Sequence, residues 1–358
     1  MGETGLAVVG GCGSSGTTLL IHLLSRHPQV VSAPELNFFN HPETFDVAVF
    51  AESLDALLAR RRLANGYKQV VSFMSRRRKL GIDRELLAAW AARARDVAEL
   101  HALLAEHMCA RVGATHFVEK TPTNVYAFAR LTRENPRARL VHLVRDGRDV
   151  AASLVKRGKS LYGGGSRWLY DTLAGLRARG HPSYLEIRYE DLVADTAPTL
   201  ARVYAHLGLP DAPQMPKADT PGTYRENWRK KQSSGAHWNL TPDDAVSAAS
   251  VGRFTRDLTP EQLALLLRIR LTDRAARALE TPLRSVPELL AQLGYAEHAV
   301  SARGGLREGA DAWLAAAGDG AARALRGFRY TRRLSLPLTT LGPAPSARSA
   351  SAGAARAS

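Results

Sequence analysis

The sequence predicts an α/β domain in which a parallel sheet lies between layers of helices. Four short apolar runs have the composition of strands buried on both faces, namely residues 5–11, 114–120, 138–146 and 183–191. A segment with the apolar spacing of a helix follows each run. Strands that alternate with helices are typical of a three-layer α/β architecture, so we expect these strands to form one sheet.

Several helix ends are marked by their own residues. The helix after the first strand carries leucines on one side and is expected to stop at Pro28. The helix TLARVYAHLGLP after the fourth strand is expected to end at Gly208 and Pro210, residues typical of a helix stop. A later helix is expected to begin at Thr259, because a threonine followed by Pro-Glu is typical of a helix start.

The remaining segments suggest how the chain is organised. We expect one main domain over residues 1–300, with a helical insertion at 43–110 that either shapes a substrate pocket or only packs against the domain. Residues 209–250 have little periodicity and predict a long loop on the substrate side. A helical extension is expected over 301–334, and low complexity predicts a disordered tail at 335–358.

The chain is strongly basic, with 49 Lys or Arg against 34 Asp or Glu and a formal net charge of +15. Such a balance favours anionic partners in general. The sequence contains none of the nucleic-acid recognition motifs, so we expect no nucleic-acid partner. Two basic runs in the insertion, at 60–62 and 76–79, are interpreted as a solvated helical face or as a docking patch for an acidic substrate or carrier protein.

The cysteine and histidine content points away from disulfides and metals. Cys12 and Cys109 are too few for a disulfide framework, which fits a reducing compartment. His22, His27 and His142 lack metal-ligand spacing, so we expect no metal. The first residues lack the features of a signal peptide, and no stretch reaches the roughly 18 apolar residues of a membrane span. We therefore expect a cytoplasmic protein, and the oligomeric state stays open.

The segment GGCGSSGTTLL, residues 10–20, has the spacing of a phosphate-binding loop between a strand and a helix. Backbone N–H groups of such a turn attract an anion together with the helix N-terminus. Thr17 stands where a nucleotide triphosphatase has the lysine that reaches the β- and γ-phosphates. This disfavours ATP and GTP, and leaves either a different phosphate or a purely structural turn.

A second anion site is predicted after the third of these strands. Arg145 ends that strand, and Ser153 lies two turns along the helix that follows. An arginine at the carboxyl edge of a strand beside the loop and a hydroxyl from the next helix would converge on a second phosphate. The alternative is local, because Arg145 and Asp149 are spaced as an i, i+4 pair of the kind that usually decorates helix surfaces.

Several motifs taken together resemble the sulfotransferase superfamily, specifically its bacterial and tyrosylprotein-sulfotransferase-like branch. They extend over about residues 5–260 and read VVGGCGSSGTTLL, HPQVVSAPE, FVEKTP, VHLVRDGRDVAAS, IRYEDLV and SVGRFTRDLTPEQ. The resemblance implies a three-layer P-loop-type fold that binds 3′-phosphoadenosine-5′-phosphosulfate (PAPS) and moves its sulfuryl group to an acceptor, usually a hydroxyl. It also suits Thr17, because PAPS has no γ-phosphate and the family needs no magnesium.

The resemblance implies two groups of donor contacts. Backbone and hydroxyl groups of the loop would hold the 5′-phosphosulfate, and the residues concerned are Gly13, Ser14, Ser15, Gly16, Thr17 and Thr18. Arg145 and Ser153 match the family's contacts to the 3′-phosphate. Arg157, Tyr189 and Arg253 match further cofactor contacts by position.

Two residues are candidates for the chemistry. Glu35, in SAPELNFF, stands where tyrosylprotein-type enzymes carry a catalytic glutamate, and a carboxylate beside a hydroxyl accepts its proton as the S–O bond forms. Lys120, in EKTP, matches a lysine near the transferring group that would offset charge on the leaving phosphate. The alternatives are a charge without a role for Glu35 and an ion pair with neighbouring carboxylates for Lys120.

Ser14 departs from the pattern, because the family usually has lysine or arginine immediately before SGTT. Lys120 or an arginine from 209–253 would have to replace that cation; otherwise the enzyme is slow or the chain has lost its activity. We expect a PAPS-dependent sulfotransferase that acts on a hydroxyl of a small molecule, sugar, natural product or carrier-bound intermediate. The alternatives are an ATP-dependent P-loop phosphotransferase and a non-catalytic nucleotide-binding protein.

Overall fold

The computed structural model describes residues 3–33, 35–40, 45–52, 54, 73, 77–211, 246–295 and 339–342. The chain forms two compact units, which are described separately. The first unit comprises residues 1–144 and 178–248, and the second comprises residues 145–177 and 249–358. The predicted extension at 301–334 and most of the predicted loop at 209–250 lie outside the described residues. The predicted domain boundaries therefore stay predictions.

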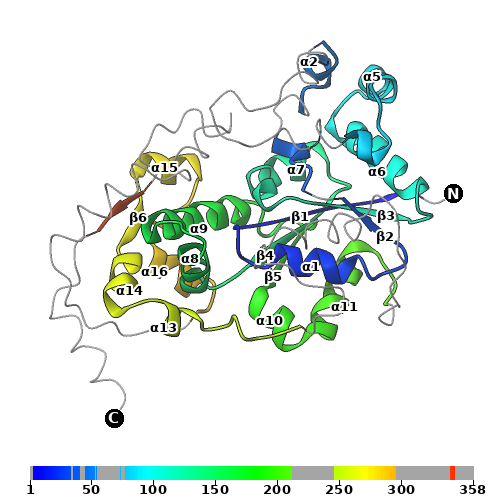
Figure 1. Ribbon diagram of the computed structural model, residues 1–358. Helices are drawn as coiled ribbons and strands as arrows, with labels where there is room; N and C mark the ends of the chain where they lie inside the picture. The colour runs from blue at the N-terminus through cyan, green and yellow to red at the C-terminus, as the bar shows by residue number, and fades with distance from the viewer. Residues whose placement is uncertain are drawn as a thin grey trace. The chain divides into compact units, whose positions relative to one another are not determined.

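The first unit is built on a five-stranded parallel sheet with the order β2-β3-β1-β4-β5 (Figure 1). Its strands are β1 (Gly5–Gly11), β2 (Val30–Ser32), β3 (His116–Lys120), β4 (Arg139–Val144) and β5 (Tyr184–Arg188). Four of them lie within the four apolar runs, which confirms the predicted parallel sheet. Strand β2 is absent from the prediction, because it has three residues and its conformation depends on pairing with β3.

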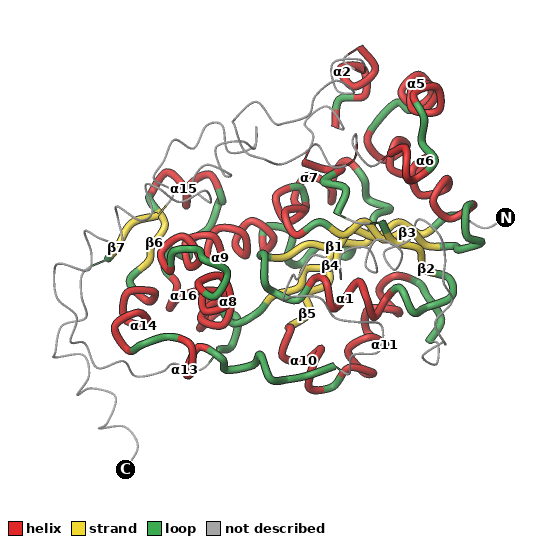
Figure 2. The backbone as a smooth tube through the Cα atoms, viewed as in Figure 1, coloured by secondary structure: helices red, strands yellow, loops and turns green. Residues whose placement is uncertain are grey.

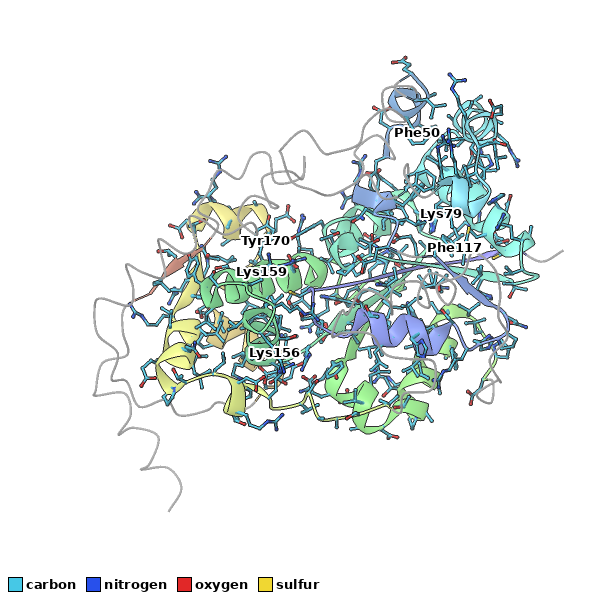
Figure 3. The ribbon with its side chains drawn as sticks, in the orientation of Figure 1. Phe50, Lys79, Phe117, Lys156, Lys159 and Tyr170 are labelled. Atoms are coloured by element: carbon cyan, nitrogen blue, oxygen red, sulfur yellow. The ribbon has the colours of Figure 1, made fainter. Side chains whose placement is uncertain are left out.

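Helices cover both faces of this sheet, so the unit has three layers (Figure 1). On one face lie α1 (Thr17–Leu24), α10 (Tyr189–Ala194) and α11 (Thr196–Leu207), whose apolar side chains share one buried core with those of the sheet. The other face is covered by α6 (Val97–Ala110) and α7 (Phe128–Glu134). Phe117 of β3 is fully buried there against His101 of α6 (Figure 3).

The described parts of the predicted insertion at 43–110 are mostly helical. Its helices are α2 (Val47–Glu52), the 3-10 helix η3 (Arg77–Leu80), α5 (Arg84–Arg93) and α6. The carboxylates of Asp83 and Asp96 accept backbone hydrogen bonds at the starts of α5 and α6. Of the two basic runs, 60–62 lies outside the described residues, whereas Arg77 in the other run is buried and donates to a backbone carbonyl.

The part of the second unit that the structure describes is mainly helical. Its helices are α8 (Gly147–Val155), α9 (Leu161–Leu176), α13 (Phe254–Asp257), α14 (Pro260–Leu267), α15 (Asp273–Ala278) and α16 (Val286–Gln292). Helices α8 and α9 approach closely because Gly147 lies against the Trp168 ring, where a Cβ would collide with the indole. The predicted helix start is confirmed, since Thr259 and Gln262 form a reciprocal capping box at the start of α14.

Part of the C-terminal tail is ordered. We expect disorder over 335–358, but β7 (Thr339–Leu341) pairs with β6 (Ile269–Leu271) in an antiparallel ribbon (Figure 2). Thr339 is buried, and its hydroxyl donates to Tyr162 OH at 2.8 Å. Tail residues of low complexity are ordered here because β6 supplies backbone partners and α9 supplies a hydroxyl partner. Residues 335–338 and 343–358 of the tail lie outside the described ranges.

Candidate functional site

The predicted phosphate loop connects β1 to α1 in the first unit. A hydrogen bond from Ser15 N to Cys12 O, 3.0 Å long, closes its turn. Gly16 occupies the N-cap of α1 with a φ of 95°, a left-handed conformation that glycine adopts without strain. Gly16 has no side chain to cap the helix, and the first turn of α1 has no acidic residue. The positive end of the helix is therefore available to an anion.

Hydroxyl groups gather at this turn. Ser15 is buried, and its Oγ has no hydrogen-bond partner among the residues that the structure describes. Buried hydroxyl groups normally have a hydrogen-bond partner, and the Ser15 hydroxyl is placed so that it can donate to an oxygen atom of a ligand. Thr17 is buried, and Gly13 and Thr18 are half-buried. Ser14 has a φ of 76°, so it adopts the left-handed conformation that usually selects glycine or asparagine.

Tyr189, a predicted donor contact, lies beside the loop. It is the first residue of α10, follows β5 directly and is buried. Its ring lies so close to Gly16 that a Cβ at this glycine would collide with it. The absence of a side chain at Gly16 therefore serves two purposes, because it permits the positive φ and makes room for the tyrosine ring.

Glu35 and Lys120, the two candidates for the chemistry, form an ion pair in the first unit. Lys120 Nζ donates to Glu35 Oε1 at 2.8 Å. The lysine side chain is 2% exposed, whereas that of the glutamate is 45% exposed. The sequence left open that Lys120 only forms an ion pair with a neighbouring carboxylate. Such an ion pair is present, and its carboxylate is that of Glu35, the candidate base. The fold brings together two residues that lie far apart in the sequence.

A second carboxylate, absent from the predicted site, precedes Lys120 in β3. Glu119 is fully buried. Its Oε1 accepts from Leu36 N at 3.3 Å and from Thr121 Oγ1 at 2.7 Å, and its Oε2 accepts from Asn124 Nδ2. Burial raises the pKa of Glu119, and these hydrogen bonds oppose the rise. The one signal in the sequence was a carboxylate next to the apolar residues of a buried strand.

Arg145 and Ser153 occupy the predicted places in the second unit, after the end of β4 and on α8. Both are buried. Arg145 Nη2 donates to Ser250 O and lies 3.6 Å from Asp149 Oδ2. The side chains of this i, i+4 pair are 5% and 1% exposed, so the pair does not decorate a helix surface.

Asp149 does more than pair with its neighbour on the helix. Its Oδ2 accepts from Gly252 N at 2.9 Å, and its Oδ1 accepts from Phe254 N at 3.0 Å. Burial raises the pKa of Asp149, and the two backbone hydrogen bonds oppose this rise. The carboxylate therefore fixes the VGRF segment, which carries Arg253, to α8. The sequence contained no signal for this role beyond the helix spacing.

Three predicted arginines of the second unit lie close enough for their charges to interact. Desolvation lowers the pKa of Arg157, and the positive charges of Arg253 and Arg145 lower it further, although Arg157 keeps contact with solvent. Arg253 is also held by Asp257, with Nη2 2.6 Å from Oδ2. Arginines gathered in this way attract an anion with more than one charge.

The residues predicted to bind the donor thus fall into two groups, one in each unit, and their roles stay predictions. Within the described ranges, no group of three or more His, Cys, Asp or Glu side chains is arranged to hold a metal ion. A search of the helices over the same residues finds none that is both long and apolar enough to cross a membrane.

The sequence profile of the sulfotransferase family matches residues 7–213, more than half of the chain. That range contains the loop, Glu35, Lys120 and Arg145, whereas Arg253 lies beyond it. Among curated proteins, no sequence matches this chain.

Three solved structures are similar to this chain. The sulfotransferase domain from the Synechococcus PCC 7002 olefin synthase shares 19% identity with a TM-score of 0.48, over 71% of this chain and 88% of that chain. The sulfotransferase domain from the curacin biosynthetic pathway shares 16% identity with a TM-score of 0.45, over 82% and 99%. The sulfotransferase from Alicyclobacillus acidocaldarius shares 16% identity with a TM-score of 0.36, over 64% and 89%.

Proposed function

Because this chain belongs to the sulfotransferase family, we propose that it transfers a sulfuryl group from PAPS to a hydroxyl group of an acceptor. The observation that carries the choice of donor is the gathering of Arg145, Arg157 and Arg253 in the second unit. Arg145 pairs with Asp149 and Arg253 with Asp257, and the three guanidinium groups together attract an anion with more than one charge. A 3′-phosphate is such an anion, and it distinguishes PAPS from ordinary adenylates.

The loop in the first unit, considered by itself, suits a phosphosulfate group. The phosphosulfate offers oxygen atoms to the backbone N–H groups at the start of α1 and to the buried hydroxyl of Ser15. Thr17 in place of a lysine suits a donor without a γ-phosphate. Tyr189 lies against the loop and supports it from the side of α10.

PAPS supplies the sulfuryl group when it is bound. Glu35 is the base in this proposal: its carboxylate takes the acceptor proton while the acceptor oxygen forms its bond to sulfur. The bond between sulfur and the 5′-phosphate oxygen breaks in the same step, and the electron pair remains on that oxygen. Lys120 then places a positive charge beside the oxygen on which negative charge develops. Its contact with Glu35 in the present structure holds the two functional groups in one place.

The family usually has a cation at the position of Ser14, and among the residues of this unit that the structure describes we assign its task at the leaving group to Lys120. The lysine is well suited to this task because it is almost fully buried. A charge in a place that excludes water acts more strongly than the same charge in solvent. We propose that this compensates for Ser14 and keeps the enzyme active.

Calorimetry with two ligands tests the choice of donor. Adenosine 3′,5′-bisphosphate should bind without magnesium and more tightly than ATP with magnesium. Tighter, magnesium-dependent binding of ATP would contradict the proposal and favour a phosphotransferase. Binding of the bisphosphate without any transfer from labelled PAPS would instead favour a nucleotide-binding protein that has lost its activity.

The proposed acceptor is a hydroxyl group of a small molecule, a sugar, a natural product or a carrier-bound intermediate. It is identified by incubating labelled PAPS and the protein with extracts of the producing cells, followed by mass spectrometry of new sulfate esters. We further propose a cytoplasmic location, because Cys12 and Cys109 are buried and do not form a disulfide bond. Fractionation of the producing cells checks this location.

A further inference from the structure

Glu119 and Lys120 are consecutive residues of β3, so their side chains leave the strand on opposite sides. Lys120 reaches Glu35, whereas Glu119 is fully buried and reaches the backbone directly after Glu35. Both members of the Glu35–Lys120 pair are therefore connected to Glu119. Lys120 follows Glu119 directly in β3, and Glu35 precedes Leu36, whose amide donates to the Glu119 carboxylate.

Two neighbouring backbone amides after Glu35 are held by this network. Leu36 N donates to Glu119 Oε1 at 3.3 Å. Asn37 N donates to Thr121 Oγ1 at 3.0 Å, and this hydroxyl donates in turn to Glu119 Oε1 at 2.7 Å. Asn37 has a φ of 52°, so the chain turns sharply here and the two amides need fixed partners. The carboxylate and the hydroxyl together determine where this turn begins.

The other oxygen of Glu119, Oε2, is linked through Asn124 to the strand that precedes the phosphate loop. Asn124, in the 3-10 helix η4 (Pro122–Tyr126), donates from Nδ2 both to Glu119 Oε2 and to Val9 O at 3.0 Å. Val9 belongs to β1, the strand that ends at the loop. One buried carboxylate is therefore linked to the turn after Glu35, to β3 and to β1.

We propose that Glu119, with Thr121 and Asn124, is a positioning device that holds the carboxylate of Glu35 in register with Lys120 for sulfuryl transfer. These three residues form the Glu119 network. This inference rests on the proposed function, because Glu35 and Lys120 are the reacting pair there. Glu119 itself is not a catalytic residue, since it acts through the backbone next to Glu35.

A role in stability alone explains this arrangement less well. The adjacent strand residues Phe117 and Val118 are fully buried and apolar, so an apolar residue at position 119 would also fill the core. Burying a carboxylate is unfavourable unless its hydrogen bonds compensate for the lost hydration. The hydrogen bonds of Glu119 join segments that lie far apart in the sequence. An apolar side chain forms no directional bonds and would not fix these segments relative to one another.

The test uses the variant Thr121→Val, which preserves shape and removes the hydroxyl between Asn37 N and Glu119. Its matched control is Thr199→Val, since Thr199 is also buried in the first unit and donates to a backbone carbonyl at 3.2 Å. Glu119→Leu is a second, stronger variant. For all proteins we measure thermal unfolding, hydrogen exchange of the Leu36 and Asn37 amides, and release of bisphosphate from PAPS with water as acceptor.

We expect Thr121→Val to lower kcat for bisphosphate release by roughly 10-fold or more. The Asn37 amide loses its buried hydrogen-bond partner in this variant, and the free energy of such a loss corresponds to a factor of about 10 or more. The KM for PAPS should be unchanged, and the Asn37 amide should exchange faster. Thr199→Val should change neither kcat nor the exchange of this amide. If Glu119→Leu does not fold, the result of Thr121→Val decides alone.

Several outcomes would overturn the inference. One is an Asn37 amide in Thr121→Val that exchanges as in the unchanged protein. Another is an equal loss of kcat in Thr121→Val and Thr199→Val, because the loss would then follow general stability. If Glu35→Gln abolishes turnover but Thr121→Val does not affect it, the inference fails and the proposed function stands. If the unchanged protein neither binds bisphosphate nor consumes PAPS, the proposed function fails first and the positioning role falls with it.

Discussion

Lys120 Nζ lies 2.8 Å from Glu35 Oε1, and the lysine is buried whereas almost half of the glutamate side chain is exposed. This asymmetry separates the two roles. An exposed carboxylate is accessible to an acceptor that arrives from solvent, whereas a buried ammonium group is screened little by water and exerts a strong field. The asymmetry agrees with the proposed mechanism, in which Glu35 meets the acceptor and Lys120 stabilises charge.

Replacing the base should separate binding from chemistry. Glu35→Gln preserves the size of the side chain but removes the group that accepts the proton, so turnover should fall by about 10²-fold or more. Binding of the bisphosphate, measured by calorimetry, should be unchanged. Full activity of this variant would remove Glu35 from the role of base.

Ser14 and Lys120 provide a rescue experiment. Lys120→Met should lower turnover on the order of 10²-fold or more, by analogy with loss of an oxyanion donor. Adding Ser14→Lys should restore part of this loss, because the cation returns to the place where the family usually has it. The measurement is PAPS turnover of the single and double variants. Lys79→Met, at a residue that is exposed, serves as the control for loss of a lysine. Equal rates for the single and double variants would show that the two cations do not replace one another.

Arg145 should discriminate between nucleotides with and without a 3′-phosphate. Arg145→Ala should weaken binding of adenosine 3′,5′-bisphosphate roughly 10- to 100-fold, the range for a hydrogen bond to a charged group. AMP binding should hardly change. Arg179→Ala, which breaks a partly exposed ion pair with Glu186, should affect neither ligand. Calorimetry measures all four affinities, and equal losses for the two nucleotides in Arg145→Ala would contradict the predicted role.

Stability should fall on acidification because of buried histidines. Burial lowers the pKa of His101 to about 3 in the folded protein, against about 6.5 in an unfolded chain. Between these values the unfolded state binds more protons, so the free energy of unfolding decreases as the pH falls from 6.5 towards 3. The contribution of one such histidine is at most about 1.4 kcal/mol per pH unit.

Urea unfolding at several pH values between 7 and 4 measures this slope. His101→Leu should be less stable at pH 7, because Asn135 Nδ2 loses its partner His101 Nδ1 at 3.0 Å. Its stability should nevertheless depend less on pH, since the titrating group is gone. The raised pKa values of Glu119 and Asp149 act in the opposite direction and are common to both proteins. Identical slopes for the two proteins would show that His101 is not the responsible group.

Much of the architecture could be predicted because its signals are local. A strand buried on both faces needs a continuous apolar run, and the runs at 5–11 and 138–146 have it. The left-handed Gly208 ends α11, and the capping box of Thr259 starts α14, through contacts with residues next to them in the chain. Strand β2 could not be predicted in this way, since three residues become a strand only through a partner.

The amino-acid sequence was enough to predict a phosphate loop, the candidates Glu35, Lys120 and Arg145, and a family resemblance that the match over residues 7–213 confirms. Three contacts became visible only in the folded chain: Glu35 pairs with Lys120, Glu119 holds the turn beside them, and Asp149 fixes the VGRF segment. The physical reason is that each of these contacts joins residues dozens of positions apart, so its geometry depends on how β3, α8 and their neighbours pack. Burial then turns such contacts from surface pairs into fixed, directional ones.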